Sequence, residues 1–204
     1  MGSPNWNFYR HQLELADDTP FYLGSLGGEE RDGGLGHFPG NPTLIVCLPT
    51  SGSVHAQCMG LQELFTRFTT GQYTDEDPAV MGNFIRSIMI LGFPADNLRV
   101  TDSTEEVHDG YGAVEFPILK RVEDINAHPF LIWLRSETPT HSEYAAAVEG
   151  EEEPAYWRDY DASINDGFEM FLVDCFGYPV GRWSGATPLE TLVPHIEEAF
   201  EAFR

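Results

Sequence analysis

The feature that most constrains the fold is a pair of short apolar runs separated by an amphipathic segment. The first run, "TLIVCL" at 43–48, contains no polar alternation, which is typical of a central strand covered on both faces. The following segment, "AQCMGLQELFTRF", repeats apolar residues at helical spacing, namely Leu61, Leu64, Phe65 and Phe68. A second apolar run, "SIMILGF" at 87–93, comes next. The pattern therefore predicts that the chain begins its core with a β-α-β unit.

The remainder of the chain supplies further strands. Segments 114–124 ("VEFPILKRVED") and 169–183 ("EMFLVDCFGYPVGRW") are predicted as strands, and the second should be a hairpin that turns near Gly177. Segment 126–136 ("NAHPFLIWLRS") is compatible with a strand or a helix, because its periodicity does not distinguish the two.

A helix is predicted at the C-terminal end, in "ATPLETLVPHIEEAFEAF". Thr187 and Glu190 have the spacing of a capping box, and Pro188 falls in the first turn. Pro194 should kink the helix or move its start toward Thr191. The apolar stripe consists of Leu189, Leu192, Val193, Ile196, Phe200 and Phe203.

These elements together predict an α/β sandwich of three layers around a mixed β-sheet. The length of 204 residues suits a single domain, with surface loops inserted near 70–84 and 137–166. The acidic stretch 148–167 has the composition of a solvated excursion rather than of a second domain.

The charge balance narrows the choice of partners. The formal net charge is −22, with 33 acidic residues against 11 basic ones, and Lys120 is the single lysine. Such a chain should be repelled by nucleic-acid phosphates and by anionic membrane surfaces. Basic proteins or cations are better partners, and a protein partner or a homo-oligomer is expected.

The location and redox environment are predicted from segments and cysteines. "MGSPNWNFYR" is too polar for a signal peptide, and no apolar stretch is long enough to insert into a membrane. The three cysteines, Cys47, Cys58 and Cys175, are unlike the dense, even framework of small secreted domains. We therefore expect a soluble intracellular protein, cytoplasmic or in an organelle lumen.

The turn between the first strand and the helix is where many α/β proteins place a nucleophile or bind an anion, because the first helix amides lack partners. This turn offers only Thr50, Ser51, Gly52 and Ser53. A small ligand bound by the helix amides near Gly52 and Ser53 is one hypothesis for its function.

In order along the chain, these segments resemble the glutathione peroxidase family, over nearly the whole length. The similar segments are "FPGNPTLIV", "GLQELFTRF", "ILGFPADN", "FPILKRVEDINAHPFLIWLRS", "FEMFLVDCFGYPVGRWS" and "IEEAF". The resemblance implies a thioredoxin-like fold and peroxide reduction by a cysteine or selenocysteine, assisted by a Gln, a Trp and an Asn.

The chain departs from the family at every one of these catalytic positions. The resemblance places Gly52 at the peroxidatic cysteine and Asn97 at the Gln, while Asp166 and Gly167 stand at the Trp and Asn. Ala95 occupies the cysteine that some members use for resolving. A shift by one residue would bring Ser51 or Ser53, whose hydroxyls are far less acidic than a thiol and have no sulfenic state.

A relocated nucleophile would have to be one of the cysteines present. Cys47 lies within the first strand and Cys58 within the helix, where small buried apolar roles compete with a catalytic one. Cys175, in the hairpin, could be exposed but has no evident activating base. His55 follows the turn without a second ligand at metal spacing.

Other residues are candidates for binding. The resemblance implies that Arg182 matches an arginine which in some members binds the carboxylate of the thiol substrate; an ion pair with an acid is the alternative. Asp96 and Asp166 could bind a cation, or could be a chance pair in so acidic a chain. Tyr156, Trp157 and Tyr160 are typical of an interaction surface unless their rings fold onto the core.

Two functions from different classes follow. The first is a glutathione peroxidase-like protein without the catalytic residues, acting as a non-catalytic accessory or structural subunit of a larger assembly. The second is an active thiol-dependent peroxidase that uses Cys47 or Cys58 with a glutathione- or thioredoxin-type reductant. Neither requires a cofactor or a metal, and glutathione would be a partner only of the second.

Overall fold

The computed structural model describes residues 8, 11–23, 41–48, 54–69, 88–94, 114–122, 124, 126–138 and 169–201; for residues 22 and 54–56 it describes the backbone alone. These segments include the predicted β-α-β unit, the hairpin and the C-terminal helix. The predicted surface loops at 70–84 and 137–166 lie outside them, except that 137 and 138 end a helix.

The core of the molecule is a four-stranded mixed sheet in the order β4-β3-β5-β6. β3 (Thr43–Leu48) runs parallel to β4 (Met89–Pro94) and antiparallel to β5 (Glu169–Val173), which pairs with β6 (Pro179–Ser184). All six residues of β3 are buried, as its uninterrupted apolar run predicts. β4 begins two residues later than the predicted strand and extends through Pro94.

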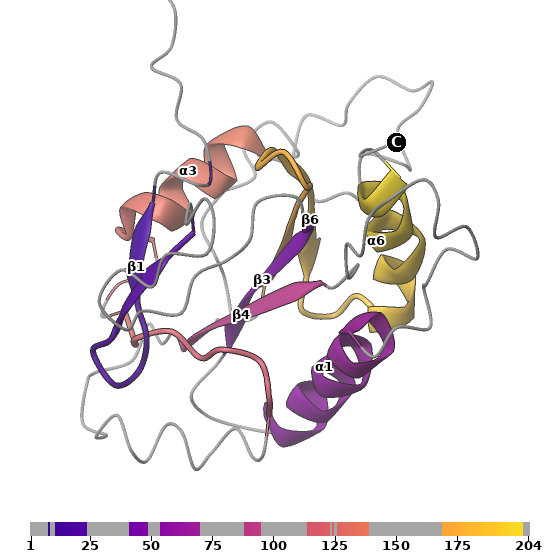
Figure 1. The fold of residues 1–204 in the computed structure, drawn as a ribbon, viewed down its shortest axis with the longest axis horizontal. Helices are drawn as coiled ribbons and strands as arrows, with labels where there is room; N and C mark the ends of the chain where they lie inside the picture. Colours follow the sequence, from indigo (N-terminus) through magenta and orange to yellow (C-terminus); the bar gives the residue numbers. More distant parts are fainter. Residues whose placement is uncertain are drawn as a thin grey trace, which may run out of the picture.

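Helices cover both faces of this sheet, which gives the three predicted layers (Figure 1). Leu44, Val46 and Leu48 point toward α1 (Val54–Thr69) and α6 (Leu192–Glu201). Ile45 and Cys47 point to the opposite face, where α3 (Pro129–Glu137) packs. The α/β three-layer prediction is therefore confirmed.

Most of segment 126–136, whose sequence was compatible with a strand or a helix, forms the helix α3. Its helix begins at Pro129, where the missing N–H costs nothing because first-turn amides have no intrahelical acceptor. Phe130, Leu131, Trp133 and Leu134 are its buried residues.

The C-terminal helix begins differently from the capping-box prediction. A 3-10 turn, η2 (Leu189–Thr191), precedes α6, and its N-cap is Pro188, with no side-chain cap hydrogen bond. The Thr187 hydroxyl instead lies 3.3 Å from the Ser184 hydroxyl. Pro194 falls in the first turn of α6, where proline is tolerated, so the start is shifted as predicted.

The prediction of a strand at 114–124 is wrong, because the described residues of this segment form no regular strand. Its middle makes only isolated bridges, Ile118 with Gly92 of β4 and Leu119 with Leu15. Two consecutive residues, Ile118 and Leu119, thus pair with different neighbours, and Pro117 offers no N–H to a ladder.

A two-stranded hairpin, β1 (Gln12–Glu14) with β2 (Pro20–Tyr22), was not predicted. It lies on the α3 side of the sheet, where Leu13 and Phe21 join the same apolar cluster as α3 (Figure 1). Segment 114–122 connects it to β4, because the Lys120 amide donates to Glu14 and the Leu119 amide to Gly92.

No helix in these described segments combines the length and apolar character needed to cross a membrane.

Candidate functional site

The catalytic positions implied by the resemblance are close in sequence to strand ends that share one edge of the sheet. Leu48 and Pro94, the paired last residues of parallel β3 and β4, end at this edge, and antiparallel β5 starts there at Glu169. The positions follow or precede these strand ends: Gly52 and Ser53, Ala95 to Asn97, and Asp166 with Gly167. All of them lie outside the described residues, as do Tyr156, Trp157 and Tyr160, and His55 is described by its backbone alone.

Cys47, the first candidate for a relocated nucleophile, is buried in the centre of the sheet. It is fully inaccessible, and its register partners are Phe93 on β4 and Glu169 on β5. Burial, reinforced by the charge of Glu169, raises the pKa of the thiol well above its ordinary value, and Arg182 and Arg135 offset only part of this. The environment therefore favours a protonated thiol.

The other two cysteines are also buried. Cys58 of α1 is inaccessible within the apolar cluster, and burial raises its pKa to about 11. Cys175 is only 4% exposed, so the expectation that it could be exposed is wrong, and burial beside Asp174 raises its pKa. All three cysteines of the chain are thus buried.

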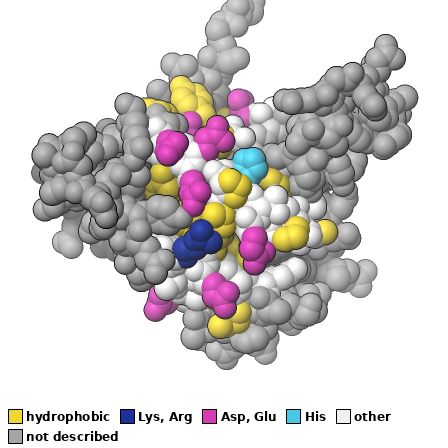
Figure 2. Space-filling view, turned by 90° about the vertical axis from the view of Figure 1, so that its right-hand side faces the viewer, with side chains coloured by type: hydrophobic (Ala, Val, Ile, Leu, Met, Phe, Trp, Pro, Cys, Tyr) yellow, Lys and Arg dark blue, Asp and Glu magenta, His cyan; other side chains and the backbone are white. Residues whose placement is uncertain are grey.

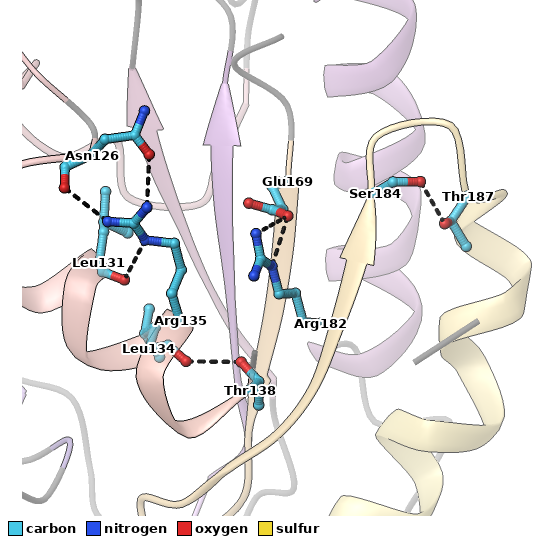
Figure 3. Close-up of polar contacts among 9 residues, drawn as sticks. All are labelled: Asn126, Leu131, Leu134, Arg135, Thr138, Glu169, Arg182, Ser184 and Thr187. Atoms are coloured by element: carbon cyan, nitrogen blue, oxygen red, sulfur yellow. Dashed lines mark hydrogen bonds and ion pairs between the residues drawn. The ribbon is translucent and has the colours of Figure 1, made fainter. Parts of the chain in front are cut away.

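Arg182 forms a buried ion pair on the α3 face of the sheet (Figure 3). Its Nε and Nη2 both lie 2.7 Å from Oε1 of Glu169, and the arginine side chain is wholly buried. The guanidinium also lies over the ring of Phe171, 5.5 Å from the centroid. In this position Arg182 has no exposed surface to offer a ligand, and the geometry is that of a structural pair.

The hairpin tip at 174–178 is held rigidly by Asp174. Its carboxylate accepts hydrogen bonds from the amides of Phe176 and Tyr178, both at 2.9 Å, and Gly177 supplies a φ of 85°. The tip and the start of β6 expose Phe176 (48%), Tyr178 (62%) and Val180 (52%). Sequence reasoning missed this patch, although the apolar residues around a predicted turn were a signal for it.

Two partly buried histidines, His11 and His128, were also not identified from the sequence. His128 packs edge-on against Phe93 at 5.7 Å, and His11 contacts Phe130 and Trp133, both at 5.0 Å. Burial lowers the pKa of both, and proximity to His128 lowers that of His11 further. The position of His128 directly before Pro129 at a helix start could have indicated a fixed orientation.

A pocket of about 390 Å³ lies beside His128, on the α3 side of the sheet. Its lining comes from β1, the end of β4, segment 114–122 and the residue before α3, namely Gln12, Leu13, Glu14, Phe93, Lys120, Arg121, Val122 and His128. None of these is a catalytic position implied by the resemblance. Within the described residues there is also no group of three or more His, Cys, Asp or Glu side chains placed to hold a metal.

The surface over α1 and α6 is acidic. Figure 2 looks onto this side, and acidic side chains outnumber basic ones among scattered hydrophobic ones. Exposed acidic residues here are Glu63 of α1, Glu190 of the adjoining η2, and Glu198 and Glu201 of α6. The ion pair of Arg67 with Glu197 is long, at 3.9 Å, and exposed.

In sequence, the chain is similar to a glutathione peroxidase of Molluscum contagiosum virus subtype 1, with 27% identity over 144 residues. That match covers 63% of this chain and 64% of the relative, so it spans less than two thirds of the viral protein. No protein-family model matches the chain.

Solved structures match over a greater length. The match to the crystal structure of Trgpx in apo form covers 96% of this chain and 97% of the Trgpx chain, with a TM-score of 0.63 and 21% identity. The structure of T. cruzi GPX1 covers 98% and 99%, with a TM-score of 0.59 and 18% identity. Together with the viral relative and the sheet order observed here, these likenesses show that the chain has the thioredoxin-like fold of the glutathione peroxidase family.

Proposed function

We propose that this chain is a glutathione peroxidase-like protein that does not catalyse thiol-dependent peroxide reduction and serves as an accessory or structural subunit of a larger assembly. The observation that carries the proposal is the state of its thiols. The chain has three cysteines, all of them buried and all with a raised pKa.

Peroxide reduction needs a thiolate that the peroxide can reach, because the thiolate attacks one oxygen and becomes a sulfenic acid. A thiol with a pKa of about 11, as at Cys58, is almost entirely protonated at neutral pH. Cys47 is disfavoured further by the neighbouring carboxylate of Glu169. The serines and Gly52 of the turn at 49–53 cannot supply the missing chemistry.

The proposal of a binding role draws on the surface. The acidic side chains over α1 and α6 suit a partner with a basic face, as does the net charge of −22. The hairpin tip adds Phe176 and Tyr178, whose fixed backbone spares part of the entropy that ordering a loop on binding would cost. A second copy of the same acidic chain is a poorer fit, because like charges would oppose each other.

An active thiol peroxidase is the competing function, since the viral relative carries the name glutathione peroxidase. Here it would require the strand or the helix to open and expose Cys47 or Cys58. Such an enzyme would consume peroxide with glutathione or thioredoxin, and alanine at the responsible cysteine would abolish turnover.

The deciding experiment measures peroxide consumption by the purified chain with each reductant, beside the Cys47→Ala and Cys58→Ala variants. We expect no rate above the reductant alone and slow alkylation of all three thiols at neutral pH. Gly52→Cys is the matched control, because it restores a thiol where the family has one. Turnover by the unmodified chain that one alanine variant abolishes would refute the non-catalytic proposal.

The accessory role is tested separately, by the size of the protein in extracts of its native source. A stable complex larger than the chain is expected. Recovery as a partner-free monomer would contradict this part of the proposal, whatever the activity assay shows.

A further inference from the structure

The pocket beside His128 has walls that are fixed by backbone hydrogen bonds. The Lys120 amide donates to the Glu14 carbonyl at 2.7 Å, and the Val122 amide donates to the Pro94 carbonyl at 3.3 Å. Segment 114–122 is thereby tied to β1 on one side and to β4 on the other. A pocket held in this way needs little reorganisation to bind a ligand.

The pocket brings together two of the few basic residues of the chain. The single lysine, Lys120, and its neighbour Arg121 both line the pocket, although the whole chain has only 11 basic residues. Among the described residues of the lining, Glu14 is the only carboxylate, and its Oε2 lies 2.9 Å from Nζ of Lys120. Asp18 binds the same Nζ at 2.7 Å, from outside the lining.

The other described residues of the lining are apolar or neutral. Leu13, Phe93 and Val122 provide apolar surface, and the ring of His128 packs edge-on against Phe93. Nδ1 of His128 is buried without a hydrogen-bond partner, and burial lowers the pKa of this histidine, which favours the neutral ring. A ligand that hydrogen-bonds to this nitrogen would remove the cost of leaving it unsatisfied.

We propose that this pocket binds a small organic carboxylate, with the carboxylate beside Lys120 and Arg121 and an apolar body against Phe93 and Val122. The volume of about 390 Å³ lies within the range of small-molecule sites. Cationic side chains beside apolar surface select an anion that carries a hydrophobic portion over a bare anion. The inference is independent of whether the chain reduces peroxide.

The test titrates the full-length chain with para-fluorophenylacetate and follows the ligand by fluorine NMR. The neutral amide of the same acid is the matched ligand, and inorganic phosphate is the competitor without an apolar body. Arg121→Gln removes the guanidinium charge from the pocket. Arg67→Gln is the control variant, because Arg67 is an exposed arginine on α1 that does not line the pocket.

We expect the acid to bind at least tenfold more tightly than the amide, Arg121→Gln to weaken its binding about tenfold, and Arg67→Gln to leave it unchanged. Lys120→Met, in which Glu14 and Asp18 lose their cation, should also weaken binding, which keeps the test valid if Arg121→Gln misfolds. Equal binding of acid and amide, absence of binding at millimolar acid, or an unaffected Arg121→Gln variant would each overturn the proposal. Equal competition by phosphate would overturn the role of the apolar body.

Discussion

The two faces of the central sheet bury different kinds of side chain. The face toward α1 and α6 is filled by apolar side chains such as Leu44, Leu172 and Ile196. The face toward α3 carries all three polar side chains that are buried among the described residues, namely Thr43, Glu169 and Arg182. Each lies two positions from a residue of the same strand that shares its face, respectively Ile45, Phe171 and Val180. An apolar face is sufficient to drive folding, whereas buried charges cost desolvation. The pocket and both partly buried histidines also lie on the α3 side, which is therefore the side to search for function.

The largest effect should come from breaking the buried ion pair. Arg182→Met leaves the carboxylate of Glu169 buried without its cation, which we expect to lower the free energy of unfolding by about 3–5 kcal/mol in urea titrations. Replacing both partners, as Glu169→Leu with Arg182→Met, should restore most of this loss, because no charge remains buried.

The exposed pair Arg67–Glu197 is the control for this prediction, since its atoms are 3.9 Å apart and both side chains are more than 40% exposed, at 46% and 41%. Arg67→Gln should change the free energy of unfolding by less than about 1 kcal/mol. If Arg182→Met cost no more than Arg67→Gln, the contrast between the two faces would lose its main support.

A cavity made on the opposite face, toward α1 and α6, should lower the free energy of unfolding by a comparable but smaller amount. Ile196 of α6 is fully buried in the apolar cluster. We expect Ile196→Ala to lower the free energy of unfolding by about 3 kcal/mol, and Ile196→Val by about 1 kcal/mol, in the same titrations. A loss below about 1 kcal/mol for the alanine variant would mean that α6 contributes little to the core.

The apolar face is also the part of the fold that the sequence predicts best. The uninterrupted run of β3, the helical spacing in α1 and the stripe of α6 each report burial through local periodicity. The hairpin was predictable because Gly177 marks a turn between two β-rich runs. Each of these signals lies within one segment.

The α3 side depends on contacts that local patterns do not contain. Lys120 meets Glu14 across a sequence separation of 106 residues, and this pairing builds the pocket. Short β1 offers too few residues for an alternation signal. The partner of Arg182 was likewise not identifiable among 33 acidic residues until the register of β5 and β6 was known.

A smaller effect is expected at the hairpin tip, which belongs to neither packed face. Gly177 has a φ of 85°, a conformation that costs a residue with a Cβ about 1 kcal/mol. Gly177→Ala should lower the free energy of unfolding by roughly that amount, while Gly177→Asn, which tolerates positive φ, should cost less. Equal losses for the two variants would show that the backbone conformation is not the cause.

The smallest effect should be a pH dependence that comes from the α3 side alone. Burial lowers the pKa of His11 and His128 in the folded chain, so below the ordinary histidine value of 6.5 the unfolded chain binds more protons than the folded one. The stabilisation from the neutral rings is complete above 6.5 and is lost as the pH falls below it. The free energy of unfolding should therefore decrease between pH 7.5 and about 5.5, a window in which most carboxylates stay ionised.

His11→Phe with His128→Phe should flatten this dependence, whereas His195→Phe, at an exposed position beside Trp183 on the other face, should not. An unchanged slope in the double variant would assign the pH dependence to groups outside the α3 side.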